Sequence, residues 1–166
     1  MKSTIDIFKD AEAELKSKSW FKKGCWLTSV HGFPRANPEF ITFHVFKKHW
    51  FNEDNQGIHI ESYLAIDPKK RKKSYVTIHI LHHATIPGTK LKRTLISKAF
   101  VDEIYDEVSG WDDFEFRAGK YGVQPFTKVL DGSAEDFEKT LVKDITKICQ
   151  KLGPVMDEVI KDILKR

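Results

Sequence analysis

The sequence predicts an α+β fold: a four- to five-stranded antiparallel meander sheet with an N-terminal helix and two C-terminal helices packed on one face. The spacing of apolar residues supports this prediction. It is helical at the start of the chain, alternates with a period of two from about residue 26 to 82, and becomes helical again after residue 90. With 166 residues, the chain is expected to form one domain over residues 1–166.

The first helix is expected over residues 4–18. Ser3 and Thr4 are candidate N-terminal caps, because a hydroxyl at this position accepts a hydrogen bond from the first helical turn. The apolar residues that follow at helical spacing are Ile5, Phe8, Ala11 and Leu15.

Four segments rich in β-branched and aromatic residues come next, and we expect strands over residues 26–30, 40–46, 58–66 and 75–82. The connections between them are residues 31–39, 52–57 and 67–74. Each connection is too short to hold the helix of a parallel crossover, so neighbouring strands should be antiparallel.

The second half of the chain is expected to be mainly helical. Apolar spacing predicts a helix over residues 90–108, and residues 111–117 form either a short edge strand or an ordered loop. A loop over 117–125 contains two glycines and a proline. The last helix should begin at Ser133 and be kinked or split at Gly153-Pro154.

Alternation along the strands assigns side chains to the two faces of the sheet. One face should be core, and it carries Ile58, Ile60, Leu64, Val76, Ile78 and Ile80. The opposite face, called here the polar face, carries His44, His59, Glu61, Tyr63, Tyr75, Thr77 and His79. His82 and His83 either extend this face or close the fourth strand.

The polar face is the main candidate site. Strands in a sheet lie about 4.8 Å apart, so histidine and carboxylate side chains on adjacent strands can share protons or bind a metal. Two histidines and one carboxylate suit iron or zinc. The alternatives are a plain solvent-facing surface and a contact surface for a non-metal ligand or partner.

Lys69, Lys70, Arg71, Lys72 and Lys73 form a run of five cations, called here the basic loop. Because adjacent cations repel one another, we expect a solvated loop. It is a candidate for contacts with nucleic-acid phosphates; the alternative is a charged turn that protects the sheet edge from aggregation.

Charge is unevenly distributed along the chain. Residues 1–93 carry 17 Lys and Arg against 9 Asp and Glu, a net +8, and residues 94–166 carry 11 against 15, a net −4, which together give +4. A basic half is compatible with an anionic partner, although the total excess is small for a dedicated nucleic-acid-binding protein.

Several classes of protein are disfavoured. No stretch approaches the roughly 18 apolar residues of a membrane span, and the acidic N-terminus does not resemble a signal peptide, so we expect no membrane association and a cytoplasmic location. Cys25 and Cys149 are far apart and flanked by apolar residues, so their spacing is not that of metal ligands. No phosphate-binding loop, nucleophile elbow or metal motif is present, so motifs alone predict no cofactor and no metal ligand.

The leading functional interpretation is a non-enzymatic binding module for a macromolecular partner such as nucleic acid. One alternative is a metal-dependent enzyme, a hydrolase or nuclease-like protein, that uses the histidines and Glu61 of the polar face. Another is a small-ligand-binding protein with a pocket between sheet and helices, rimmed by Trp26, Phe40, Trp50 and Tyr63. The sequence does not indicate an oligomeric state.

Overall fold

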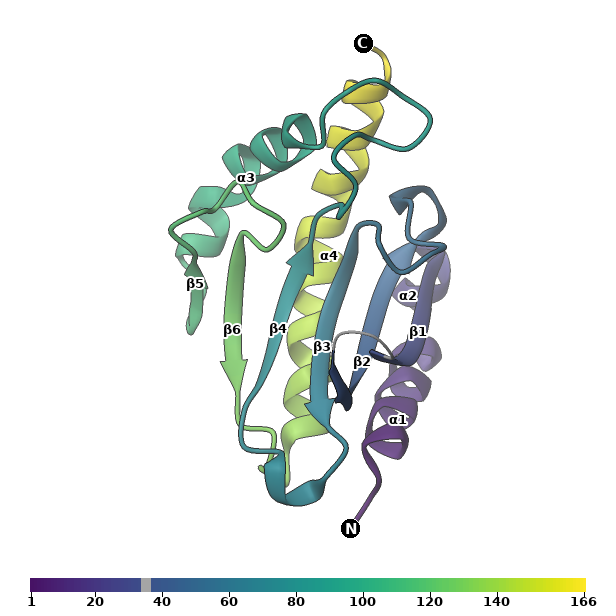
Figure 1. Cartoon of the computed structure of the whole chain (residues 1–166), viewed down its shortest axis with the longest axis vertical. Helices are drawn as coiled ribbons and strands as arrows, with labels where there is room; N and C mark the ends of the chain where they lie inside the picture. The colour runs from purple at the N-terminus through teal and green to yellow at the C-terminus, as the bar shows by residue number, and fades with distance from the viewer. Residues whose placement is uncertain (34–36) are drawn as a thin grey trace.

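The computed structural model describes residues 1–33 and 37–166 and confirms the predicted fold class (Figure 1). Its elements, in chain order, are α1 (Thr4–Ser17), α2 (Ser19–Lys23), β1 (Trp26–Phe33), β2 (Asn37–Lys47), η1 (Lys48–Trp50), β3 (His59–Ala65), η2 (Pro68–Lys70), β4 (Ser74–His79), α3 (Thr94–Ser109), β5 (Phe114–Phe116), β6 (Phe126–Leu130) and α4 (Phe137–Leu164). The predicted turn between the first two strands includes residues 34–36, which lie outside the described residues.

The strands form one antiparallel sheet in the order β1-β2-β3-β4-β6-β5. The first four follow one another as the meander prediction requires. The sheet has six strands because residues 126–130, which were not predicted to be a strand, form β6 between β4 and β5. Of the two expectations for residues 111–117, the edge strand is confirmed as β5.

One face of the sheet is covered by helices. α1 packs against β1 and β2, α4 packs against β3 and β4, and α3 packs against α4 and β5. Figure 1 shows α1 and α4 on the same side of the sheet. The predicted core side chains on this side are fully buried: Ile58, Ile60, Leu64, Val76, Ile78 and Ile80. The assignment of side chains to faces is therefore confirmed.

Local hydrogen bonds explain where the helices begin. Ser3 caps α1, because its hydroxyl accepts a hydrogen bond from the Asp6 N–H at 3.1 Å. The helix expected over residues 90–108 begins later, as α3 at Thr94. Residues 85–92 instead form a tight turn in which the Ile86 N–H donates to the Leu91 carbonyl at 2.8 Å. Ser133 does not cap the last helix, since its hydroxyl donates to the Asp131 carboxylate at 2.6 Å.

The last helix, α4, continues through Gly153 and Pro154, so of the expected kink or split the split is wrong. Gly153 faces the Trp26 indole, and a Cβ at this position would lie 2.7 Å from the ring. The glycine therefore allows the helix to approach the sheet closely, while Pro154 is exposed on the helix surface. Among the described residues, no helix is long and apolar enough to cross a membrane.

Candidate metal centre

Strand register brings the predicted residues of the polar face together. His44 on β2 lies opposite Glu61 on β3, and His59 lies opposite His79 on β4. All four side chains are at least nine-tenths buried, with exposed fractions of 1–7% for the residues. At this level of the sheet the polar face is therefore not a plain solvent-facing surface.

Imidazole rings form a continuous row across the polar face. The rings of His44 and His59 are stacked with centroids 3.5 Å apart, and His79 stacks on the other side of His59 at 4.8 Å. His31 meets His44 edge-on at 4.6 Å, and the exposed His82 meets His79 at 4.1 Å. We call these five residues the histidine row. His83 lies outside it and pairs with Asp54 at 3.3 Å.

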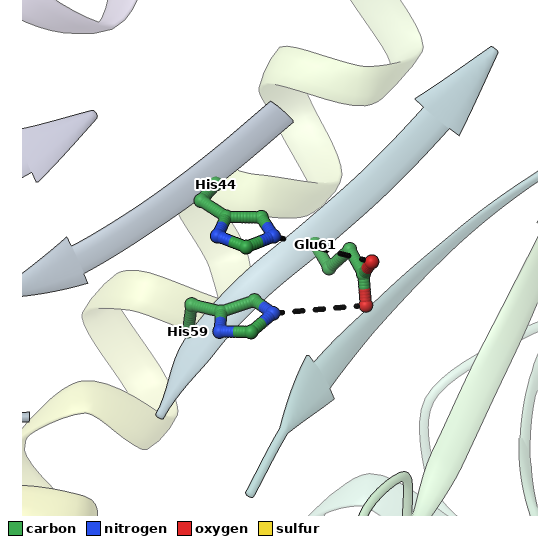
Figure 2. A group of neighbouring side chains, drawn as sticks. All are labelled: His44, His59 and Glu61. Carbon is green, nitrogen blue, oxygen red and sulfur yellow. Dashed lines mark ion pairs between the residues drawn. The ribbon is translucent and has the colours of Figure 1, made fainter. Parts of the chain in front are cut away.

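Three side chains of this face, His44, His59 and Glu61, form a group that could hold a metal ion, called here the His–Glu centre (Figure 2). His44 Nε2 lies 4.0 Å from Glu61 Oε1, and His59 Nε2 lies 3.7 Å from Glu61 Oε2. Figure 2 shows both Nε2 atoms facing the carboxylate. Ligand atoms on a tetrahedral zinc ion are about 3.3 Å apart. The two histidine–carboxylate distances exceed this by roughly 0.4 and 0.7 Å, and all three ligand atoms lie within 4.8 Å of one another, so the side chains must move closer together to hold an ion.

Asn52 and Gly57 contact the histidine rings at Nδ1, on the side of each ring away from Glu61. His59 Nδ1 lies 2.9 Å from the Gly57 carbonyl and 3.0 Å from Asn52 Oδ1. Because both partners are acceptors, Nδ1 carries the hydrogen, and the Nε2 that faces Glu61 is free to bind a metal. Metal-binding histidines commonly have such a partner on the second nitrogen.

The side-chain amide of Asn52 also contacts His44, but through its nitrogen, Nδ2, instead of its oxygen. The Gly57 N–H donates to Asn52 Oδ1 at 3.0 Å, which fixes the orientation of the amide and directs Asn52 Nδ2 toward His44 Nδ1 at 3.4 Å. In the neutral ring the hydrogen then lies on His44 Nε2. The Nε2 atom of neutral His59 therefore already has the free lone pair that a metal ligand needs. His44 must first move its hydrogen from Nε2 to Nδ1.

The loop that carries Asn52 is anchored at both ends. The Trp50 indole N–H donates to the Asp157 carboxylate of α4 at 2.8 Å, and the Trp50 carbonyl accepts a hydrogen bond from the Ile58 N–H at 2.8 Å. Lys47 also donates to Asp157, at 2.6 Å. Burial raises the pKa of Asp157, but its hydrogen bonds to Lys47 and Trp50 outweigh burial, so that the pKa is lowered overall.

The electrostatics of the centre favour a positive charge beside Glu61, carried either by a protonated His59 or by a metal ion. Burial raises the pKa of Glu61, but a His59 ring protonated on both nitrogens would donate from Nε2 to the carboxylate and carry a positive charge, and these two effects outweigh burial, so the pKa of Glu61 is lowered overall. When the neutral ring of His59 carries its hydrogen on Nδ1, the Nε2 lone pair faces the carboxylate at 3.7 Å, and a second proton or a metal ion on Nε2 removes the repulsion between them. A cation at this point satisfies both groups.

The neighbouring imidazoles are held neutral. Burial, followed by the charge of His59, lowers the pKa of His44 well below its usual value and that of His79 to about 3. The same two causes lower the pKa of His31 and His82. Neutral imidazole is the form that binds a metal, so this environment favours ligation over protonation.

The other predicted residues of the polar face are not part of the centre. Thr77 lies opposite Glu61 on β4, and Tyr63 and Tyr75 pair two residues farther along the strands. The rings of Tyr63 and Tyr75 are 5.5 Å apart, and burial and the nearby Tyr75 raise the pKa of Tyr63 to about 12. Thr77 donates its hydroxyl to the Phe126 carbonyl. None of these three belongs to the three-residue group.

The structure does not support the expected pocket between sheet and helices. Trp26 and Trp50 pack edge to face in the core, with ring centroids 5.2 Å apart. Phe40 and Tyr63 pack together on the polar face at 5.6 Å. The four side chains lie on opposite sides of the sheet and cannot line one pocket.

The basic loop is only partly solvated, so the prediction is wrong for Arg71. This side chain is buried, and its guanidinium donates to the carbonyls of Ala65 at 3.2 Å and Lys2 at 2.9 Å. Arg71 therefore ties the N-terminal segment to the end of β3. The other four residues are exposed: Lys69, Lys70, Lys72 and Lys73.

Replacing these four lysines by glutamine, with Arg71 retained, is expected to abolish any salt-dependent binding of nucleic acid. Each phosphate contact on duplex DNA contributes a slope of about 0.9 in the logarithm of affinity against that of salt. Retardation of DNA and RNA in gels at low salt measures this binding. The matched control replaces four exposed lysines elsewhere, Lys16, Lys18, Lys22 and Lys23. Absence of retardation with the wild-type protein would show that the loop does not bind nucleic acid.

Two residues near the centre were not identified from the sequence. Asn52 lies in a connection that reads only as a turn, although its side chain contacts both histidines. His31 lies beyond the predicted end of the first strand at residue 30, but β1 extends to Phe33 and places it on the polar face. Continuing the two-residue alternation by one more step would have found His31.

Comparison with known proteins adds no relative to this description: no protein-family model, no curated protein and no solved structure matches the chain.

Proposed function

We propose that the protein is a metal-dependent enzyme that binds one divalent transition-metal ion through His44, His59 and Glu61. The observation that supports this proposal is a buried group of three ligand atoms within 4.8 Å of one another, in which the ring of His59 is preset for ligation by Gly57 and Asn52. Two imidazoles and a carboxylate suit zinc and non-haem iron.

The number of ligands favours catalysis over a purely structural role. Structural zinc sites usually have four protein ligands, whereas catalytic sites have three and leave a position for water or substrate. The His–Glu centre offers three among the described residues. A metal ion there would lower the pKa of a bound water, which favours a hydrolytic reaction.

Metal titration of chelator-treated protein tests the proposal. The wild-type protein should bind one zinc, iron(II) or manganese(II) ion per chain, and Glu61→Gln or His59→Ala should weaken binding by at least about 100-fold. At a free metal concentration of 100 times Kd, the ion should stabilise the fold by about 2.7 kcal/mol. Calorimetry and thermal unfolding measure the two effects.

His82→Ala is the matched control, because His82 belongs to the histidine row but is exposed and outside the centre. It should bind metal as the wild-type protein does. Equal losses in His82→Ala and His59→Ala, or no binding by the wild-type protein, would refute the assigned ligands.

Metal-loaded protein should also hydrolyse simple ester or phosphoester substrates, and a loaded protein inactive on all of them would refute the enzymatic part of the proposal.

Macromolecular binding remains a prediction carried by the four exposed lysines of the basic loop. The burial of Arg71 removes one of the five cations on which it depended. The His–Glu centre is the better supported site, because its groups converge and are held by named partners.

A further inference from the structure

One buried polar atom beside the His–Glu centre has no partner. His79 is 3% exposed, and no described residue makes a hydrogen bond with its Nδ1. Buried polar atoms in proteins are nearly always paired, so an orphan of this kind points to a ligand, a water or a functional role. An unpaired buried imidazole nitrogen is destabilising by itself.

The position of His79 relates this atom to the proposed metal. Its ring is parallel to that of His59 within 7°, at a centroid distance of 4.8 Å, and His59 in turn faces Glu61. His79 is not one of the three grouped ligands. His79 is therefore adjacent to the centre, and its Nδ1 atom has no hydrogen-bond partner among the described residues.

The charge balance of the loaded centre indicates the kind of ligand. A divalent ion beside one carboxylate leaves an excess of one positive charge in a buried environment, where uncompensated charge is costly. An anion at the open metal position would compensate the excess, and a nearby imidazole N–H could donate a hydrogen bond to it.

We infer that the metal-loaded centre binds a small oxyanion, such as a phosphate or carboxylate group, and that His79 Nδ1 donates a hydrogen bond to it. This inference rests on the proposed function and specifies the substrate class of that site. His79 is then a ligand-positioning residue that does not contribute to metal affinity.

Titration of the cobalt(II)-loaded protein with inorganic phosphate and with acetate tests the inference, because the visible spectrum of cobalt reports changes in its ligands. The wild-type protein should bind at least one of the two anions. Binding of phosphate alone would identify a tetrahedral oxyanion as the ligand, and binding of acetate alone would identify a carboxylate.

His79→Phe replaces the ring by one without a polar atom, and it should weaken anion binding about tenfold or more with cobalt affinity unchanged. His79→Asn retains a hydrogen-bonding group and should lose less, which also covers the case that the phenylalanine variant does not fold. Metal-free His79→Phe should be at least as stable as the wild-type protein, because the orphan atom is gone.

Three results would overturn the inference. The first is that cobalt binds but neither anion changes its spectrum, and the second is that both His79 variants bind anions as the wild-type protein does. In these two cases metal binding by the centre still stands. Failure of the wild-type protein to bind cobalt at all would overturn the proposed function as well. His83→Ala, which lies outside the histidine row and pairs with Asp54, serves as the control here and should leave anion affinity unchanged.

Discussion

Ile78→Ala should lower the free energy of unfolding by about 2 to 5 kcal/mol, because it removes buried methyl groups and leaves a cavity. Ile78 is fully buried and pairs with the equally buried Ile60 across β3 and β4, on the face covered by α4. Denaturant unfolding followed by circular dichroism measures the change.

Ile66→Ala is the matched control for this substitution. Ile66 follows β3 and is 47% exposed, so the same chemical change should alter stability by no more than about 0.5 kcal/mol. Similar losses in the two variants would contradict the assignment of faces on which the polar face depends.

Gly57→Ala should both destabilise the protein, by about 3 kcal/mol, and weaken metal binding. A Cβ at residue 57 would lie 2.0 Å from the Phe51 carbonyl oxygen and 2.5 Å from the Asn52 nitrogen, so the backbone of the loop must move. That movement would disturb the contacts of Gly57 with Asn52 and His59. Denaturant unfolding and metal titration measure the two effects.

Gly119→Ala provides the control, because a Cβ at residue 119 would meet no atom within 4 Å. It should leave metal affinity unchanged. If Gly57→Ala bound metal with wild-type affinity, the arrangement of Asn52 and Gly57 behind the histidines would have no part in holding the metal.

The face assignments were predictable because alternation is a local property of the chain. Ile60 and Ile78 are core, and His59 and His79 share the other face, as the period of two required. The register that places His44 opposite Glu61 was not predictable in this way. It depends on the pairing of whole strands, which alternation leaves undetermined.

Other differences arise from tertiary contacts. The segment 126–130 is short, follows a loop with two glycines and a proline, and becomes a strand by pairing with both β4 and β5. Arg71 lies in a run of cations, yet three backbone carbonyls provide it with a buried site. Asn52 gave no signal, because its contacts come from two strands that flank its loop.

The insertion of β6 between β4 and β5 has a consequence for the order of folding. β1 to β4 pair with their neighbours in the chain, whereas the pairing of β6 with β4 must close a long loop that includes α3. Contacts between distant segments form slowly, so the meander should form first. The His–Glu centre takes its groups from β2 and β3, and Asn52 lies between these strands. A metal ion present during refolding should therefore accelerate the early phase of folding as well as stabilise the final state.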